Sequence, residues 1–89
     1  MIKTKLCYDT LSIELLLKDN KLYPNNVVAY DHEGNQLWKI NDILKIQTPC
    51  GISVIKKSGD HIMSAISSAG ILYVIDVTSK EVVSTSLMR

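Results

Sequence analysis

The segment Asp31-His32-Glu33 places an imidazole between two carboxylates. Such a set could act as a base or hold a metal ion, because histidine titrates and ligates near neutral pH. Gly34 follows directly, and Asp at the first position with Gly at the fourth is the pattern of a type I turn. We therefore expect Asp31 to cap a turn while His32 and Glu33 face water.

A second set that could do chemistry is Cys50 with His61, as a nucleophile and its base. A reactive thiolate needs an electropositive, partly exposed surrounding, and only Lys56 and Lys57 lie nearby in the sequence. No family signature surrounds Cys50. The pattern therefore does not favour a thiol enzyme.

Metal and phosphate sites also lack support in the sequence. His32 and His61 match no spacing of metal ligands, and neither cysteine belongs to a C-x-x-C pair. The chain contains only four glycines and no phosphate-binding glycine loop. The sequence thus predicts a protein that is not an enzyme and that uses no cofactor and no metal ion.

The elements that would position these residues are predicted to be strands. Leu11, Ile13, Leu15 and Leu17 alternate with more polar residues, which favours a strand over residues 11–18, although Leu and Glu also suit a helix. Further strands are expected at 2–8, 27–30, 36–40, 52–57, 61–67, 71–77 and 82–87, and a short run at 43–47 ends at Pro49. This spacing predicts an all-β fold, a single domain over residues 1–89 with seven or eight short antiparallel strands. The strands would form a meander that closes as a sandwich or a barrel.

Two parts of the chain follow a similar sequence pattern, which we call the internal echo. Residues 30–39 can be aligned with residues 75–84, and both read as an apolar residue, Asp, a turn and a strand. Residues 29–38 and 72–77 resemble a blade of the quinoprotein-like propellers. Two blades cannot close a ring, since propellers need four or more. We therefore interpret the echo as a repeated hairpin.

Composition limits the class of protein. The chain has 89 residues, of which 46% are hydrophobic and 21% charged, and its net charge is +1. This balance is that of one globular domain and argues against a strongly basic nucleic-acid module. The N-terminus has no apolar leader, and the apolar stretch at 71–77 is too short to span a bilayer. We expect a cytoplasmic chain with no membrane partner, in which Cys7 and Cys50 are reduced and buried.

A small domain without catalytic motifs has the profile of a stand-alone protein inhibitor. In its length and its lack of motifs the chain resembles the bacterial immunity proteins of contact-dependent inhibition and other toxin–immunity systems. The resemblance implies a protein that binds one cognate toxin domain in a tight heterodimer and blocks its active site. Many such toxins are nucleases with basic active sites. A local acidic patch would therefore have to attract the partner despite the net charge of +1.

The candidate partner-binding residues are acidic or aromatic side chains. They are Asp19, Tyr23, Tyr30, Asp31, Glu33 and Asp42. Trp38 and Tyr73 are instead expected in the core of a protein that lacks Phe, whereas Tyr23 and Tyr30 are expected to be exposed. Reversing the charges of Asp31 and Glu33 should weaken partner binding and leave thermal stability unchanged.

Two alternatives have different surface requirements. A small β barrel that binds single-stranded nucleic acid would need its cations on one face beside an exposed tyrosine such as Tyr8 or Tyr73. The cations concerned are Lys3, Lys5, Lys56 and Lys57. The near-balanced charge disfavours this binding. A self-assembling β subunit would instead expose strand edges that pair between copies.

Overall fold

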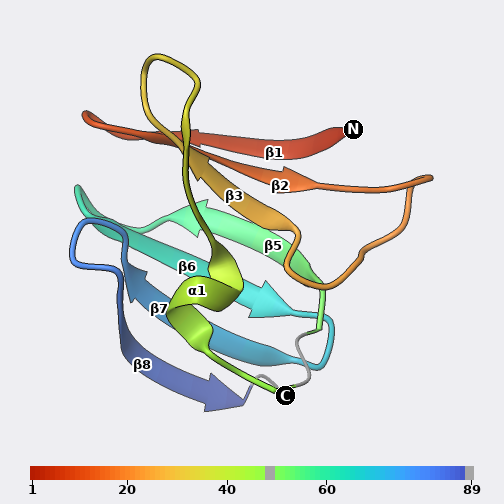
Figure 1. Ribbon diagram of the computed structural model, residues 1–89. Coiled ribbons are helices and arrows are strands. Elements are labelled where there is room, and N and C mark those ends of the chain that lie inside the picture. Colours follow the sequence, from red (N-terminus) through yellow and green to blue (C-terminus); the bar gives the residue numbers. More distant parts are fainter. Residues whose placement is uncertain (48–49, 88–89) are drawn as a thin grey trace.

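The chain folds into two four-stranded antiparallel sheets that face each other as a sandwich (Figure 1). The computed structural model describes residues 1–47 and 50–87. Sheet 1 consists of β1 (Ile2–Cys7), β2 (Ser12–Leu16), β3 (Val27–Tyr30) and β4 (Gln36–Lys39), in that spatial order. Sheet 2 consists of β5 (Ile52–Lys57), β6 (Ile62–Ser67), β7 (Ile71–Asp76) and β8 (Glu81–Leu87). The helix α1 (Ile40–Leu44) connects the sheets. The all-β prediction is confirmed, and of its two closures the sandwich is the one formed.

Alternation of side chains along the strands builds the core between the sheets. In β2, Ile13 and Leu15 are fully buried, while Ser12 and Glu14 are half-buried on the outer face. The strand assignment for this segment is therefore correct. Trp38 of β4 and Tyr73 of β7 also lie in the core, as expected from the absence of Phe.

One buried polar side chain connects the two sheets. Asn26 is completely buried just before β3. Its Nδ2 donates to the carbonyl oxygens of Leu16 at 3.1 Å and Ile52 at 3.0 Å, and its Oδ1 accepts from the Ile52 N–H at 2.8 Å. Because Leu16 ends β2 and Ile52 begins β5, this amide satisfies backbone groups of both sheets at once.

The helix α1 is a difference from the sequence prediction, which expected a strand to Ile40 and a short extended run at 43–47. Ile40 and Ile43 are three residues apart, so one turn of helix buries both on the same side. The Asp42 carboxylate accepts from the Lys39 N–H at 3.0 Å at the start of the helix. Lys45 ends the helix in the left-handed region with φ of 54°. The packing of both isoleucines in the core, together with these caps, outweighs the strand pattern.

The internal echo corresponds to a hairpin loop with an aspartate cap in each of the two sheets. Asp31 follows β3 and Asp76 ends β7, and each carboxylate caps the loop that leads to the last strand of its sheet. The Asp76 Oδ1 accepts from the N–H groups of Thr78 at 2.9 Å and Ser79 at 3.0 Å. The repeated hairpin is thus a common feature of two similar meanders.

The two cysteines differ from the expectation in one respect. Cys7 and Cys50 are free, but both are exposed, whereas burial was expected. Cys7 is the last residue of an edge strand on its outward face, and Cys50 precedes β5. Within the described residues, no helix has the length and apolar character needed to cross a membrane.

Candidate functional site

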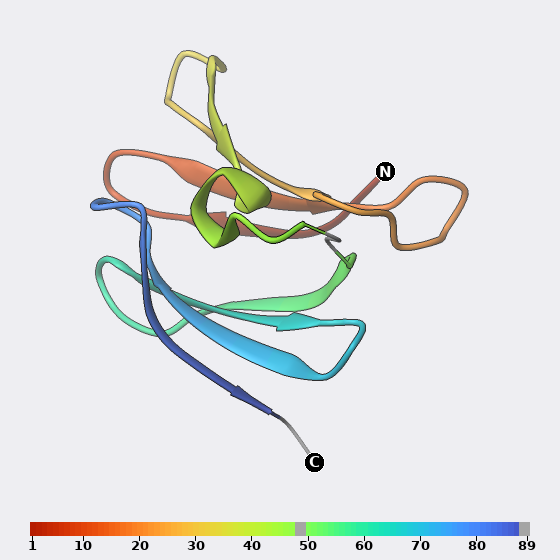
Figure 2. The ribbon, with the colours of Figure 1, turned by 60° about the horizontal axis from the view of Figure 1, so that its bottom comes forward.

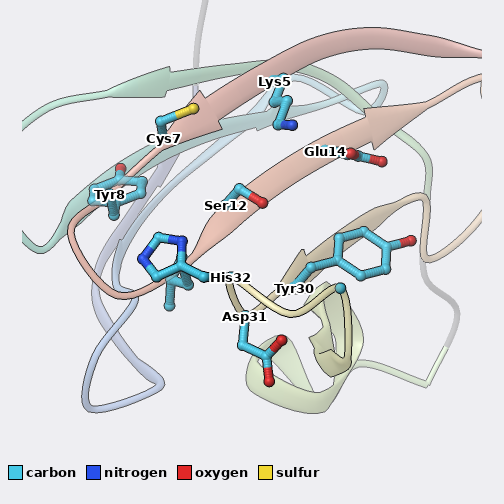
Figure 3. A pocket seen from close by; sticks show the side chains of 10 residues that line it. Lys5, Cys7, Tyr8, Ser12, Glu14, Tyr30, Asp31 and His32 are labelled. Carbon is cyan, nitrogen blue, oxygen red and sulfur yellow. The ribbon is translucent and has the colours of Figure 1, made fainter.

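A pocket of about 390 Å³ lies on the outer face of sheet 1. It lies where β1, β2 and the end of β3 meet the loop between β3 and β4, which we call the capped loop (residues 31–35). The strand register explains why side chains of three strands meet in this pocket, because Ser12 of β2 is the partner of both Cys7 of β1 and Tyr30 of β3. Figure 3 shows the side chains of this pocket along β1, β2 and the capped loop. The lining residues are Lys5, Cys7, Tyr8, Leu11, Ser12, Glu14, Tyr30, Asp31, His32 and Gly34.

The capped loop is held in one conformation by Asp31. Its Oδ1 accepts from the N–H groups of Glu33 and Asn35, both at 2.9 Å, and its Oδ2 accepts from the Asn35 side-chain amide at 3.1 Å. The Gly34 N–H donates to the Asp31 carbonyl at 3.1 Å, and Gly34 has φ of 88°. The predicted turn is therefore confirmed. Hydrogen bonds, above all those from Asn35, lower the pKa of Asp31, since they favour its charged form.

A second contact fixes the capped loop against the turn between β1 and β2. The His32 Nε2–H donates to the carbonyl oxygen of Asp9, which assigns the proton to that nitrogen. The neighbouring Tyr8 is buried, and its hydroxyl donates to the Ile62 carbonyl of sheet 2 at 2.8 Å. Burial raises the pKa of Tyr8, so the phenol remains a donor. The loop therefore rests on a turn that is itself anchored in the sandwich.

The pocket combines apolar surface with a slight negative charge. Lys5 and Glu14 are paired residues of neighbouring strands, so their opposite charges offset each other within the pocket. The lining contains the cation Lys5 and the two carboxylates of Glu14 and Asp31. Counted with histidine uncharged, its formal charge is +1 − 2 = −1. Glu33 adds a further carboxylate on the exposed tip of the capped loop. Such a surface suits a cationic side chain of a partner.

The structure brings together only part of the predicted partner-binding set. Tyr30 and Asp31 line the pocket, and Glu33 lies on the loop beside it. Asp19 and Tyr23 belong to the connection between β2 and β3, which leaves sheet 1 at the opposite end (Figure 1).

The remaining candidates have positions of their own. Asp19 and Asn20 form a tight turn, with φ of 53° and 60°, between the paired backbones of Lys18 and Lys21. Asp42 caps α1. Tyr30 and Tyr23 are half-buried, whereas both were expected to be exposed.

Sequence reasoning missed the strand residues that complete the pocket. Lys5 and Cys7 of β1 lie beside Glu14 and Ser12 of β2. Their alternation was visible in the sequence, but it shows only that they share a face of a hairpin. The pocket requires β3 to pair with β2, and that order is set by the meander rather than by any motif.

The lysines of the nucleic-acid hypothesis lie on the neighbouring edge strands β1 and β5. The Lys3 ammonium donates to the Ser53 carbonyl at 2.8 Å, and the Lys57 ammonium donates to the Cys7 carbonyl at 3.1 Å. Lys57 also stands 4.8 Å from the centre of the Tyr8 ring. Two of the four cations thus join the sheets to each other, and both Tyr8 and Tyr73 are buried. Neither ring is exposed for bases to stack upon.

Cys50 and His61 do not form a dyad in this structure. Cys50 precedes β5 at the end where Ile52 pairs with Ser67, while His61 precedes β6 at the other end of the same pair of strands. Six residues of strand separate the two ends by about 17 Å. The His61 Nδ1 lies 3.2 Å from the Thr78 hydroxyl. Among residues 1–47 and 50–87, no three His, Cys, Asp or Glu side chains gather closely enough to hold a metal ion.

Comparison with known proteins found no matching family model, no matching curated protein and no matching solved structure.

Proposed function

We propose that this protein is a non-enzymatic inhibitor, an immunity protein that binds a cognate toxin domain and covers its active site. The observation that supports the proposal is the slightly acidic pocket beside the capped loop. A rigid projecting loop next to a hollow is a suitable docking element, because little conformational freedom is lost when a partner binds it.

The recognition we propose is electrostatic and aromatic. Glu33 on the loop tip and Glu14 in the pocket attract a basic group, and Tyr30 offers a half-buried ring as contact area. The active sites of nucleases, including RNases, are rich in such basic groups. A partner of this kind would place a Lys or Arg side chain in the pocket, and the body of the sandwich would exclude its substrate. The free, exposed thiols of Cys7 and Cys50 suit a reducing compartment, and we propose the cytoplasm.

The first test is affinity capture from the organism that encodes the chain, with washes at about 0.1 M and about 0.5 M salt. The wild-type bait is compared with Glu33→Lys, which reverses a charge on the capped loop. Asp19→Lys is the matched control, because it makes the same change at an exposed site in the connection between β2 and β3, at the opposite end of sheet 1. We expect one protein to be retained by the wild type and by Asp19→Lys and to be reduced with Glu33→Lys.

Co-expression then tests the activity. The captured protein should arrest growth when it is expressed alone, and co-expression of this chain should relieve the arrest. A captured protein that is harmless alone would refute the inhibitor proposal. Nucleic acid that elutes as salt rises would support the lysine-bearing alternative instead.

A further inference from the structure

The four edge strands of the sandwich differ in how well they are protected. The edges of sheet 1 are β1 and β4, and those of sheet 2 are β5 and β8. An open edge presents unpaired backbone groups, and proteins usually protect it with lysine, proline, a bulge or a covering element. The edge strands β1 and β5 each carry two lysines. The four-residue strand β4 leads directly into α1.

The strand β8 has neither lysine nor proline, and its protection is limited to a bulge and to the nearby helix α1. Its seven residues are all exposed, and after Glu81 the sequence Val-Val-Ser-Thr-Ser-Leu contains neither a charge nor a proline. A register shift opposite Val74 and Ile75 marks a bulge near the start of the strand. Beyond the bulge, residues 84–87 pair regularly with β7 and leave their other edge open. Figure 2 shows β8 as the outermost strand of its sheet.

Two apolar side chains on this edge are unusually exposed for their size. Val83 is 60% exposed and Leu87 is 67% exposed. Thr85 and Leu87 lie opposite Tyr73 and Ile71 in the register. Val83 stands at the bulge, two residues before Thr85, and this spacing of two places it on the same side as Thr85. The strand thus combines an open edge with an apolar stripe.

The spacing of this stripe makes β8 complementary to itself. In an antiparallel pair centred on Thr85, each Val83 stands opposite Leu87 of the partner subunit. The two-fold symmetry forms this pair twice, so that both exposed apolar residues of each copy are covered. We propose that β8 pairs with β8 of a second copy of this chain around a two-fold axis at Thr85, so that two copies of sheet 2 form one eight-stranded sheet.

The geometry also predicts the strength of this contact. A single pair of strands joined over residues 83–87, with four apolar side chains, falls below the roughly 1,200 Å² that stable interfaces bury. The dimer is therefore weak, and its population depends on protein concentration. The inference is independent of the proposed function, because β8 belongs to sheet 2 and the acidic pocket lies on the outer face of sheet 1.

Sedimentation equilibrium from micromolar to millimolar concentration tests the proposal. The wild type should change from monomer to dimer over this range. Val83→Lys should weaken the dimer by about tenfold or more, because a charge then faces an apolar residue without a partner. Val54→Lys is the matched control, since Val54 is a comparably exposed valine, at 46%, on the other edge strand of sheet 2. It should leave the dimer unchanged.

A charge pair tests the register. In the double variant V83K/L87E, each Lys at 83 stands opposite a Glu of the second copy, so the dimer should return and should weaken with salt. In V83K/L87K, like charges oppose each other and the dimer should be lost. Circular dichroism confirms folding of each variant, and Leu87→Lys replaces Val83→Lys where the latter fails to fold. A wild type that stays monomeric, an equal loss with Val54→Lys, or no recovery with V83K/L87E would overturn the proposal.

Discussion

The buried amide of Asn26 allows a quantitative test of how the two sheets are held together. Its three hydrogen bonds reach Leu16 at the end of β2 and both backbone groups of Ile52 at the start of β5. Ile52 is itself only 1% exposed, so water cannot easily replace the lost partner. The substitution Asn26→Ala removes all three bonds together.

The expected loss of stability follows from these contacts. Each hydrogen bond contributes about 1 kcal/mol net, which amounts to about 3 kcal/mol for the three. Because the buried N–H and C=O of Ile52 are then left unpaired, about 3 kcal/mol is the smallest loss that we expect. For a domain of this size, a loss of about 3 kcal/mol lowers Tm by roughly 12–24 °C.

Urea denaturation followed by circular dichroism measures the change in the free energy of unfolding. Asn20→Gly is the matched control, because Asn20 is exposed and has a positive φ of 60° that glycine adopts without strain. We expect the control to change stability by less than about 0.5 kcal/mol. A loss below about 1 kcal/mol in Asn26→Ala would refute the reasoning, since it would mean that the sheets do not depend on this amide.

Three further predictions concern single contacts. The pKa values of Asp31 and Asp76 are lowered by hydrogen bonds, so their stabilising effect is present above the unfolded pKa of about 3.9 and is lost as pH falls through the lower folded values. The double variant D31N/D76N should therefore lose less Tm than the wild type in acid, and an unchanged acid slope would contradict this assignment. Tyr8→Phe removes the bond to the Ile62 carbonyl and should cost about 1 kcal/mol in urea denaturation, whereas no loss would mean that the bond is unimportant. His32→Ala should raise amide exchange in the capped loop and weaken capture of the partner while Tm changes little, and unchanged exchange would show that the loop does not need this contact.

The sequence was informative where side chains alternate or where a turn has specific requirements. Ile13 and Leu15 are buried because a period of two places them on one face, and that period is visible without any structure. The capped loop was predictable because Asp31 and Gly34 occupy the positions that the turn demands. Such features depend only on neighbours in the chain.

The features that depend on distant neighbours could not be predicted. The helix α1 is one turn long, and its two buried isoleucines also suited a strand until packing selected the helix. The pocket depends on Ser12 lying between Cys7 and Tyr30, which only the order of the strands determines. Asp31 was expected to cap its turn and also to tolerate charge reversal without loss of stability, but its carboxylate accepts three hydrogen bonds from its own loop. The charge reversal that tests binding without a cost in stability is therefore at Glu33.

Amide hydrogen exchange of the chain, alone and with its captured partner, tests the proposed site most directly. We predict slower exchange on binding in two segments, the capped loop with Tyr30 and the turn between β1 and β2. Exchange in the connection between β2 and β3 should remain as in the free protein, because that connection leaves sheet 1 at its opposite end. Protection confined to that connection or to sheet 2, with the capped loop unchanged, would contradict the claim that the acidic pocket receives the partner.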